Sequence, residues 1–268
     1  MATLQRMVIA FLTVAMLATG AVRAASTTNF SDDWYIENQA GWGMLVQQQT
    51  DVLFIGLFLY GADNKPTWFT ATASYQSNSV TGHVVFTGDL YRTNGTYYGA
   101  TWNPAALGYT KVGTLTFDAT TTNEGTLTYT VDGTQVVKNV TRQTWRYENL
   151  SGKYSGSWIN DYDSCGPWSH DESIMIDIAH NADNTVNMSF SFGKYWLFDV
   201  SGTYSQSGHI GKIVGSVDSP ALGSFTFSEI EKSTSGFTGR IDGVIRYFSG
   251  NVPNSCVTTN GRIGVARR

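Results

Sequence analysis

The amino-acid sequence predicts an all-β protein, built from two small antiparallel barrels or sandwiches that follow a cleaved signal peptide. Along most of the chain hydrophobic residues alternate with polar ones, which is the pattern of a strand with one buried face. Turns that contain glycine separate these short runs, as is typical of antiparallel barrels and sandwiches. Charged residues make up only 14% of the chain, far fewer than a helical bundle carries.

The first 24 residues have the three parts of a secretory signal peptide. Arg6 supplies a positive start, an apolar segment runs from Met7 to Ala18, and Val22-Arg23-Ala24 places small residues where a signal peptidase cleaves. The apolar segment is too short for a membrane span, which takes about 20 residues. A buried N-terminal helix is the alternative. We expect cleavage after Ala24 and an exported protein, either periplasmic or secreted, with no transmembrane segment in its mature form.

Residues 25–147 are expected to form an aromatic-rich β domain. The stretch from Val52 to Tyr60 is almost continuously apolar, so we expect a strand buried on both faces. Turn-forming residues at 61–66 and a second strand at 67–72 complete a hairpin. Further strands are expected at 80–91, 113–118, 126–131 and 135–145, with Asp132-Gly133 as the strongest hairpin turn. At most one helical turn is expected, at 104–107.

Residues 148–268 are expected to form a second, barrel-like domain, although one larger sandwich is an alternative to two domains. Alternation at 188–192 and 225–227 predicts strands there, and Ser151-Gly152-Lys153-Tyr154-Ser155 is echoed by Ser201-Gly202-Thr203-Tyr204-Ser205. The two cysteines of the chain, Cys165 and Cys256, both lie in this half. In an exported chain they are expected to form a disulfide. Two separate buried thiols are the alternative.

Composition and motifs argue against several functions. Nucleic-acid binding is disfavoured because 17 basic residues face 21 acidic ones, which gives a formal net charge of −4. The sequence has no Gly-x-Ser-x-Gly elbow and no P-loop, and Gly41-Trp42-Gly43 lacks the third glycine of a dinucleotide loop. Its four histidines are scattered without the spacing of metal ligands. We therefore expect no cofactor, no metal and no identifiable catalytic residue.

Aromatic side chains are the most informative candidates for a ligand site. Indole and phenol rings combine a broad apolar face with a hydrogen-bonding group, which suits stacking on a glycan or another small ligand, although the same rings also fill cores. At a strand end, an arginine can reach a carboxylate, a phosphate or an aromatic face. The predicted ligand-binding residues are Trp34, Tyr35, Trp42, Trp68, Tyr91, Arg92 and Trp102.

Several short motifs follow one another through the first half. They are Asn29-Phe30-Ser31-Asp32, Trp34-Tyr35, Gln39-Ala40-Gly41-Trp42-Gly43, Lys65-Pro66-Thr67-Trp68, Leu90-Tyr91-Arg92-Thr93 and Trp102-Asn103-Pro104-Ala105. Over residues 29–146 they resemble a β-module of exported proteobacterial proteins whose function is unknown. Gln39 stands where that module usually has an acidic residue, so any general base at this position would be missing here. The resemblance implies no activity.

The second half carries a weaker similarity. The run Leu150-Ser151-Gly152-Lys153-Tyr154, followed by a strand and then Ser201-Gly202-Thr203-Tyr204, resembles the avidin-like eight-stranded barrels. The similarity concerns the starts of strands. It implies a fold and transfers no biotin-binding residue.

Together these observations favour an exported, non-catalytic β protein that binds a small molecule, a glycan or a component of the cell envelope. The alternative is a hydrolase that uses two carboxylates on barrel loops against a glycan or cell-envelope substrate. The separation of such carboxylates is spatial, so the sequence selects no pair. The identity of the ligand and the oligomeric state also stay open at this level.

Overall fold

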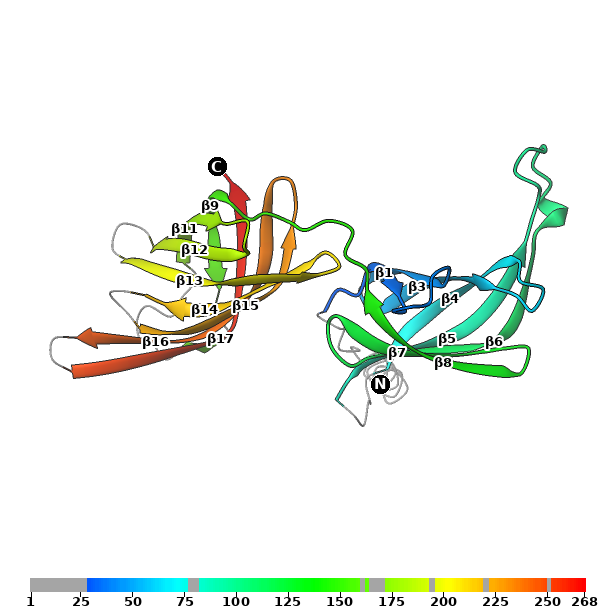
Figure 1. Cartoon of the computed structure of the whole chain (residues 1–268), viewed down its shortest axis with the longest axis horizontal. Coiled ribbons are helices and arrows are strands. Elements are labelled where there is room, and N and C mark those ends of the chain that lie inside the picture. Colours follow the sequence, from blue (N-terminus) through cyan, green and yellow to red (C-terminus); the bar gives the residue numbers. More distant parts are fainter. Residues whose placement is uncertain are drawn as a thin grey trace, which may run out of the picture. The chain divides into compact units, whose positions relative to one another are not determined.

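The protein is all-β and consists of two closed antiparallel barrels (Figure 1). The computed structural model describes residues 28–76, 82–159, 162–163, 172–192, 196–218, 222–249 and 252–268. The predicted fold class is confirmed, with barrels rather than sandwiches. The predicted boundary at 147/148 falls in the connection between the last strand of the first barrel and the first strand of the second.

The first barrel has eight strands, each hydrogen-bonded to the next along the chain. They are β1 (Asp32–Tyr35), β2 (Gly43–Gln49), β3 (Val52–Tyr60), β4 (Pro66–Gln76), β5 (Val84–Asn94), β6 (Gly108–Ala119), β7 (Glu124–Val131) and β8 (Thr134–Arg142). β1 pairs with β8 and closes the barrel. Asp132 and Gly133, with φ of 49° and 85°, make the tight turn between β7 and β8 that the sequence predicts.

β3 occupies the predicted range, but the prediction that it is buried on both faces is wrong. Leu53, Ile55 and Leu57 point into the barrel and are fully buried. Phe54, Phe58 and Tyr60 point outward and are 45%, 52% and 55% exposed. A wall strand of a small barrel has one face toward the interior and one toward solvent. The outward aromatic residues of β3 therefore lie on the surface.

A buried arginine lies where the barrel closes. Arg142 stands opposite Trp34 across the β1–β8 pair, and its side chain is inaccessible to solvent. Its guanidinium lies 5.0 Å from the centre of the Trp34 ring and 3.3 Å from Oδ2 of Asp32. A buried charge is tolerated only where such partners compensate for lost hydration. In the core of the same barrel, the ring of Phe30 packs edge-on against Phe86 and Phe117.

Between β5 and β6 the chain forms an arm, residues 95–107, that extends beyond the barrel wall (Figure 1). Shortly before the arm returns to β6 it forms a 3₁₀ turn at Pro104–Ala106, which matches the single helical turn expected there. Among the described residues, no helix is long and apolar enough to cross a membrane.

The second barrel is also closed by eight strands, and β17 pairs with β9 to complete it. The strands are β9 (Gly152–Ile159), β11 (Glu172–His180), β12 (Thr185–Phe192), β13 (Trp196–Ser207), β14 (Ile210–Val217), β15 (Leu222–Lys232), β16 (Gly236–Ser249) and β17 (Val252–Arg267). A short additional strand, β10 (Tyr162–Asp163), pairs with β17.

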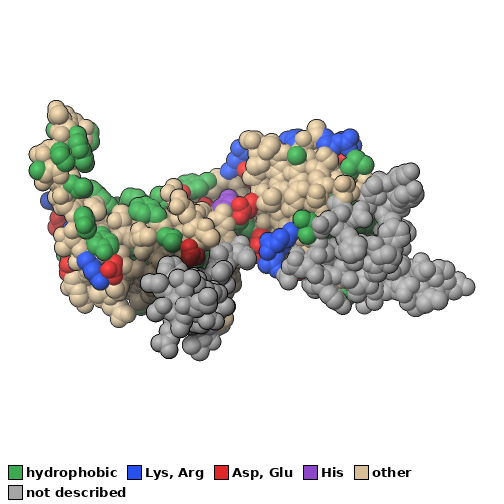
Figure 2. Space-filling model, turned by 180° about the vertical axis from the view of Figure 1, so that it is seen from behind, with side chains coloured by type: hydrophobic (Ala, Val, Ile, Leu, Met, Phe, Trp, Pro, Cys, Tyr) green, Lys and Arg blue, Asp and Glu red, His purple; other side chains and the backbone are tan. Residues whose placement is uncertain are grey.

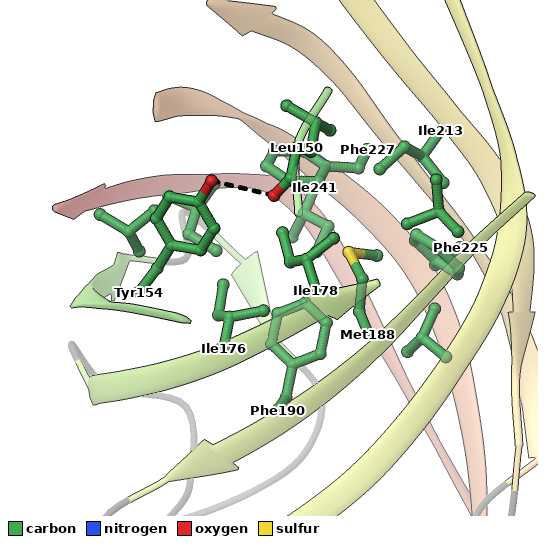
Figure 3. Packing of buried hydrophobic residues seen from close by; sticks show 14 of the residues in the cluster. Leu150, Tyr154, Ile176, Ile178, Met188, Phe190, Ile213, Phe225, Phe227 and Ile241 are labelled. Atoms are coloured by element: carbon green, nitrogen blue, oxygen red, sulfur yellow. Dashed lines mark hydrogen bonds between the residues drawn. The ribbon is translucent and has the colours of Figure 1, made fainter. Parts of the chain in front are cut away.

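Side chains fill the interior of the second barrel (Figure 3). Phe190 stacks on Phe198 with their ring centres 4.9 Å apart, and it also meets Trp158 edge-on. The hydroxyl of Tyr154 donates to the carbonyl oxygen of Leu150 at 2.9 Å, so this buried phenol is satisfied. The described part of this interior is a packed core.

Two features expected from the sequence lie outside the described residues. The proposed signal peptide, residues 1–24, is one of them. The proposed disulfide is the other, because Cys165 falls in an undescribed range, although the backbone of Cys256 is part of β17, opposite Ile245. Both stay predictions.

Two glycines of the first barrel give a matched test of its packing. A methyl group on Gly88 would fall on the carbonyl oxygen of Thr72 and within 2.9 Å of the Cα of Ala73, whereas one on Gly43 would meet no atom within 4 Å. We expect Gly88→Ala to lower the free energy of unfolding by about 1–3 kcal/mol, because the strands must separate. Gly43→Ala should leave it unchanged or raise it by about 0.5 kcal/mol. Calorimetry of the full chain measures both, and equal effects would contradict the described strand contact.

Candidate ligand-binding face

A row of outward-pointing residues crosses five neighbouring strands of the first barrel. Phe58 of β3 stands directly opposite Gly43 of β2 on one side and Trp68 of β4 on the other. Trp68 in turn reaches Thr93 of β5, which stands opposite Tyr109 of β6. We call Phe54, Phe58, Tyr60, Trp68, Tyr91 and Tyr109 the outer aromatic face. Figure 2 shows hydrophobic side chains on the arm and on the adjoining barrel wall.

The two central rings are held by contacts to the sheet beneath them. The indole N–H of Trp68 donates to the hydroxyl oxygen of Thr93 at 3.3 Å, and the side chain is 53% exposed. The ring of Phe58 lies along its own strand toward Gly56, 3.5 Å from the position that a Cβ would occupy there. Both rings are therefore oriented by neighbouring strand residues while about half of each side chain stays open to solvent.

Polar groups border these rings. Tyr91 meets Tyr109 edge-on at 6.0 Å, and its hydroxyl donates to Oδ2 of Asp89 at 3.4 Å. The other carboxylate oxygen of Asp89 accepts from the ammonium of Lys111 at 2.8 Å. This hydrogen bond raises the pKa of Lys111. The face thus combines aromatic rings with hydroxyl groups and one neutralised charge pair.

Arg92 lies at the barrel end and does not belong to the outer aromatic face. Its guanidinium sits 5.4 Å from the centre of the Phe69 ring, whose side chain is buried. One of its nitrogens is 2.6 Å from Oδ2 of Asp132, in the β7–β8 turn. The sequence analysis expected Arg92 to contact a carboxylate or an aromatic ring of a ligand. In the structure its partners are the carboxylate of Asp132 and the ring of Phe69, both within the protein.

The other predicted site residues divide between core and surface. Trp34 is 1% exposed and packs against Arg142, so a ligand on the surface cannot contact it. Tyr35, at the end of β1, is partly exposed. Trp42 is half-buried, and its indole N–H is shielded from solvent without a hydrogen-bond partner. Trp102 is exposed on the arm.

The glycines beside Trp42 also differ from each other. Gly41, at φ 90°, packs against Tyr60, because a Cβ there would lie 2.6 Å from Cε2 of that ring. The position beside the backbone is therefore occupied by the protein at Gly41 and open at Gly43.

Sequence analysis missed Phe54, Phe58, Tyr60 and Tyr109 as candidates. In β3 the outward aromatic residues alternate with inward aliphatic ones, so the continuous apolar run conceals the period of two. If aromatic and aliphatic residues had been counted separately within this run, the period of two would have been visible. Tyr109 gave no such signal, because its place beside Tyr91 depends on the register of β5 and β6.

The second barrel offers carboxylates for the alternative, hydrolytic function. Glu229 lies in a bulge of β15 with φ of 51°, partly buried and 3.8 Å from a guanidinium nitrogen of Arg240. Burial raises the pKa of Glu229, although Arg240 and Arg262 oppose the shift. A backbone in the left-handed region is unusual for a glutamate and is a feature of some functional sites.

A shallow depression of about 600 Å³ lies on the outer wall of the second barrel, beside Asp177 and Asp199. Asp177 pairs with Lys153 at 2.5 Å, and Asp199 accepts from the hydroxyl of Ser189 at 2.6 Å. Among the described residues, no three His, Cys, Asp or Glu side chains are grouped as metal ligands would be. The carboxylates of Asp177 and Asp199 therefore already have partners on neighbouring strands of the same wall.

No family model, curated protein or solved structure matches the chain. The two sequence resemblances therefore stay predictions, and the function has to be argued from the geometry.

The assignment of Trp34 to the core and of Trp68 to the surface is testable through stability. We expect Trp34→Ala to lower the free energy of unfolding of the first barrel by about 3–5 kcal/mol, because it leaves a cavity and a guanidinium without its ring. Trp68→Ala should cost about 1 kcal/mol or less, because half of the side chain is already in water. Urea unfolding of the full chain compares the two. A large loss from Trp68→Ala would mean that its ring supports the fold.

Proposed function

We propose that the chain is an exported, non-catalytic binding protein whose first barrel binds an uncharged glycan on its outer aromatic face. The observation that carries the proposal is the row of Phe58, Trp68 and Tyr109, with the Trp68 ring held by Thr93 and open to solvent. Export rests on the signal-peptide features of residues 1–24.

The chemistry of the face fits a sugar chain. One face of many sugar rings presents C–H groups, which stack on aromatic rings, while hydroxyl groups at the edge need hydrogen-bond partners. Phe58 and Trp68 are cross-strand neighbours, and Tyr109 lies two strands beyond Trp68, or about 10 Å across the sheet. The rings therefore offer separate stacking positions along a sugar chain, with Thr93 between Trp68 and Tyr109 and Thr70 two residues from Trp68 on β4.

The charges around the face favour an uncharged ligand. Lys111 is paired with Asp89, Arg92 with Asp132, and Lys65 with Asp63 at 3.9 Å. An anionic polymer is normally bound by unpaired cationic groups that it can neutralise. The paired charges beside this face would have to be separated first, and the whole chain is acidic.

The test is sedimentation of the chain lacking residues 1–24 with insoluble cellulose and with chitin. We expect it to bind at least one of them, and Phe58→Ala and Trp68→Ala each to weaken binding at least tenfold, which corresponds to about 1.4 kcal/mol. Val137→Ala removes an exposed apolar side chain on β8 and should have no effect. Because no ion pair with the ligand is involved, added salt should leave the affinity unchanged.

Two outcomes would contradict this proposal. Equal retention of the parent chain and the Trp68→Ala variant would show that the face does not bind these glycans, and preferential binding to anionic heparin would show that charge dominates. Release of soluble reducing sugar that Glu229→Gln abolishes would instead establish the alternative, a hydrolase whose carboxylate lies in the second barrel.

A further inference from the structure

The arm at 95–107 presents aromatic and aliphatic side chains that pack against nothing in the core of the barrel. Tyr98 is 94% exposed, and Tyr97, Trp102 and Leu107 are also largely exposed. Hydrophobic side chains gather on this projection in Figure 2. A cluster of exposed apolar side chains, unlike a single one, is typical of a surface that contacts a membrane or another molecule.

Several polar backbone groups at the base of the arm find partners within the arm itself. The hydroxyl of Thr96 donates to the carbonyl oxygen of Asn103 at 2.9 Å and accepts from its N–H at 2.9 Å. The side chain of Asn103 accepts from the N–H of Ala105 at 3.0 Å, and that of Asn94 donates to the carbonyl oxygen of Ala106 at 3.0 Å. These bonds brace the base of the arm, and its outer part, residues 97–102, projects beyond the barrel wall (Figure 1).

The arm is also free of charge. From Thr93 to Thr110 the sequence contains no Asp, Glu, Lys, Arg or His. The flanking cations, Arg92 and Lys111, lie at its root, and each is paired with a carboxylate of the barrel. Charged groups are costly within a bilayer, while Trp and Tyr concentrate at the level of the lipid headgroups.

We infer that the arm inserts its tip into the interfacial region of a lipid bilayer. Tyr97, Tyr98 and Trp102, toward the tip of the arm, would lie among the headgroups, whereas Leu107, directly before β6, stays at its base. The segment is too short to cross a bilayer, so it would attach the protein to one leaflet. The arm has no charged residue, and the cations at its root are paired, so no free cation attracts anionic lipids. We therefore expect the protein to bind zwitterionic lipid as strongly as anionic lipid.

This inference does not depend on glycan binding, because it rests on different residues. An apolar protein groove is a less suitable receiver, since residues 97–102 carry Tyr and Trp, which concentrate at the headgroup level, and no Leu, Ile or Val. A continuation of the glycan site onto the arm is an outcome that the experiment below separates.

The test uses the chain lacking residues 1–24 and sedimentation with phosphatidylcholine vesicles. We expect the chain to bind, and the double variant Tyr98→Ser/Trp102→Ser to bind at least tenfold more weakly. Ala100→Asp, which places a charge at an exposed position in the outer part of the arm, should have a similar effect. Val137→Ser, on β8, is the matched control and should bind as the parent chain does. Including anionic phosphatidylglycerol should not strengthen binding.

Several results would overturn the inference. They are failure of the parent chain to bind vesicles, undiminished binding by both arm variants, and binding only when anionic lipid is present. Loss of cellulose or chitin binding in the arm variants, without vesicle binding by the parent chain, would assign the arm to the glycan site. Unchanged circular dichroism spectra of the arm variants establish that the barrel is folded in each case.

Discussion

Closure of the first barrel is the constraint on which the rest of its chemistry depends. Once β1 pairs with β8, each wall strand has one side toward a small interior and one side toward solvent. Leu53, Ile55 and Leu57 already occupy the inner side of β3, so its three aromatic residues must lie outside. The closing pair itself contains a buried charge, because Arg142 is held between Trp34 and Asp32. The exposed aromatic face is a direct consequence of an interior that is filled by other side chains.

The sequence was sufficient for features that depend on neighbours along the chain. It predicted the β3–β4 hairpin, the Asp132-Gly133 turn, the 3₁₀ turn of the arm and the division into two β domains, because periodicity and turn chemistry are local. It did not predict which aromatic residues are exposed. Trp34 is in the core because Arg142, more than a hundred residues later, stands opposite it. Arg92 is occupied because the register of the barrel brings Asp132 to it.

The two barrels present different outer walls. On β11 to β13 of the second barrel, polar side chains such as Asp177, Ser189 and Asp199 pair with one another or with Lys153. On β3 to β6 of the first, aromatic rings occupy the corresponding outward positions and the charges lie at the border. Both barrels have packed cores, so the aromatic residues on the outer wall of the first barrel are not needed to fill its interior. They distinguish the surface of the first barrel from that of the second. This difference is the reason why we propose the first barrel as the binding domain.

The most direct test of the account is an NMR titration that follows the indole N–H signals of the full set of tryptophans as a soluble chito- or cello-oligosaccharide is added. The account predicts that the Trp68 signal moves with saturating dependence on ligand, because its ring is a stacking surface whose N–H is fixed to Thr93. The Trp34 signal should stay in place, because that ring is enclosed beside Arg142. A Trp68 signal that does not respond to a sugar which the chain binds, or a response centred on Trp34, would contradict it.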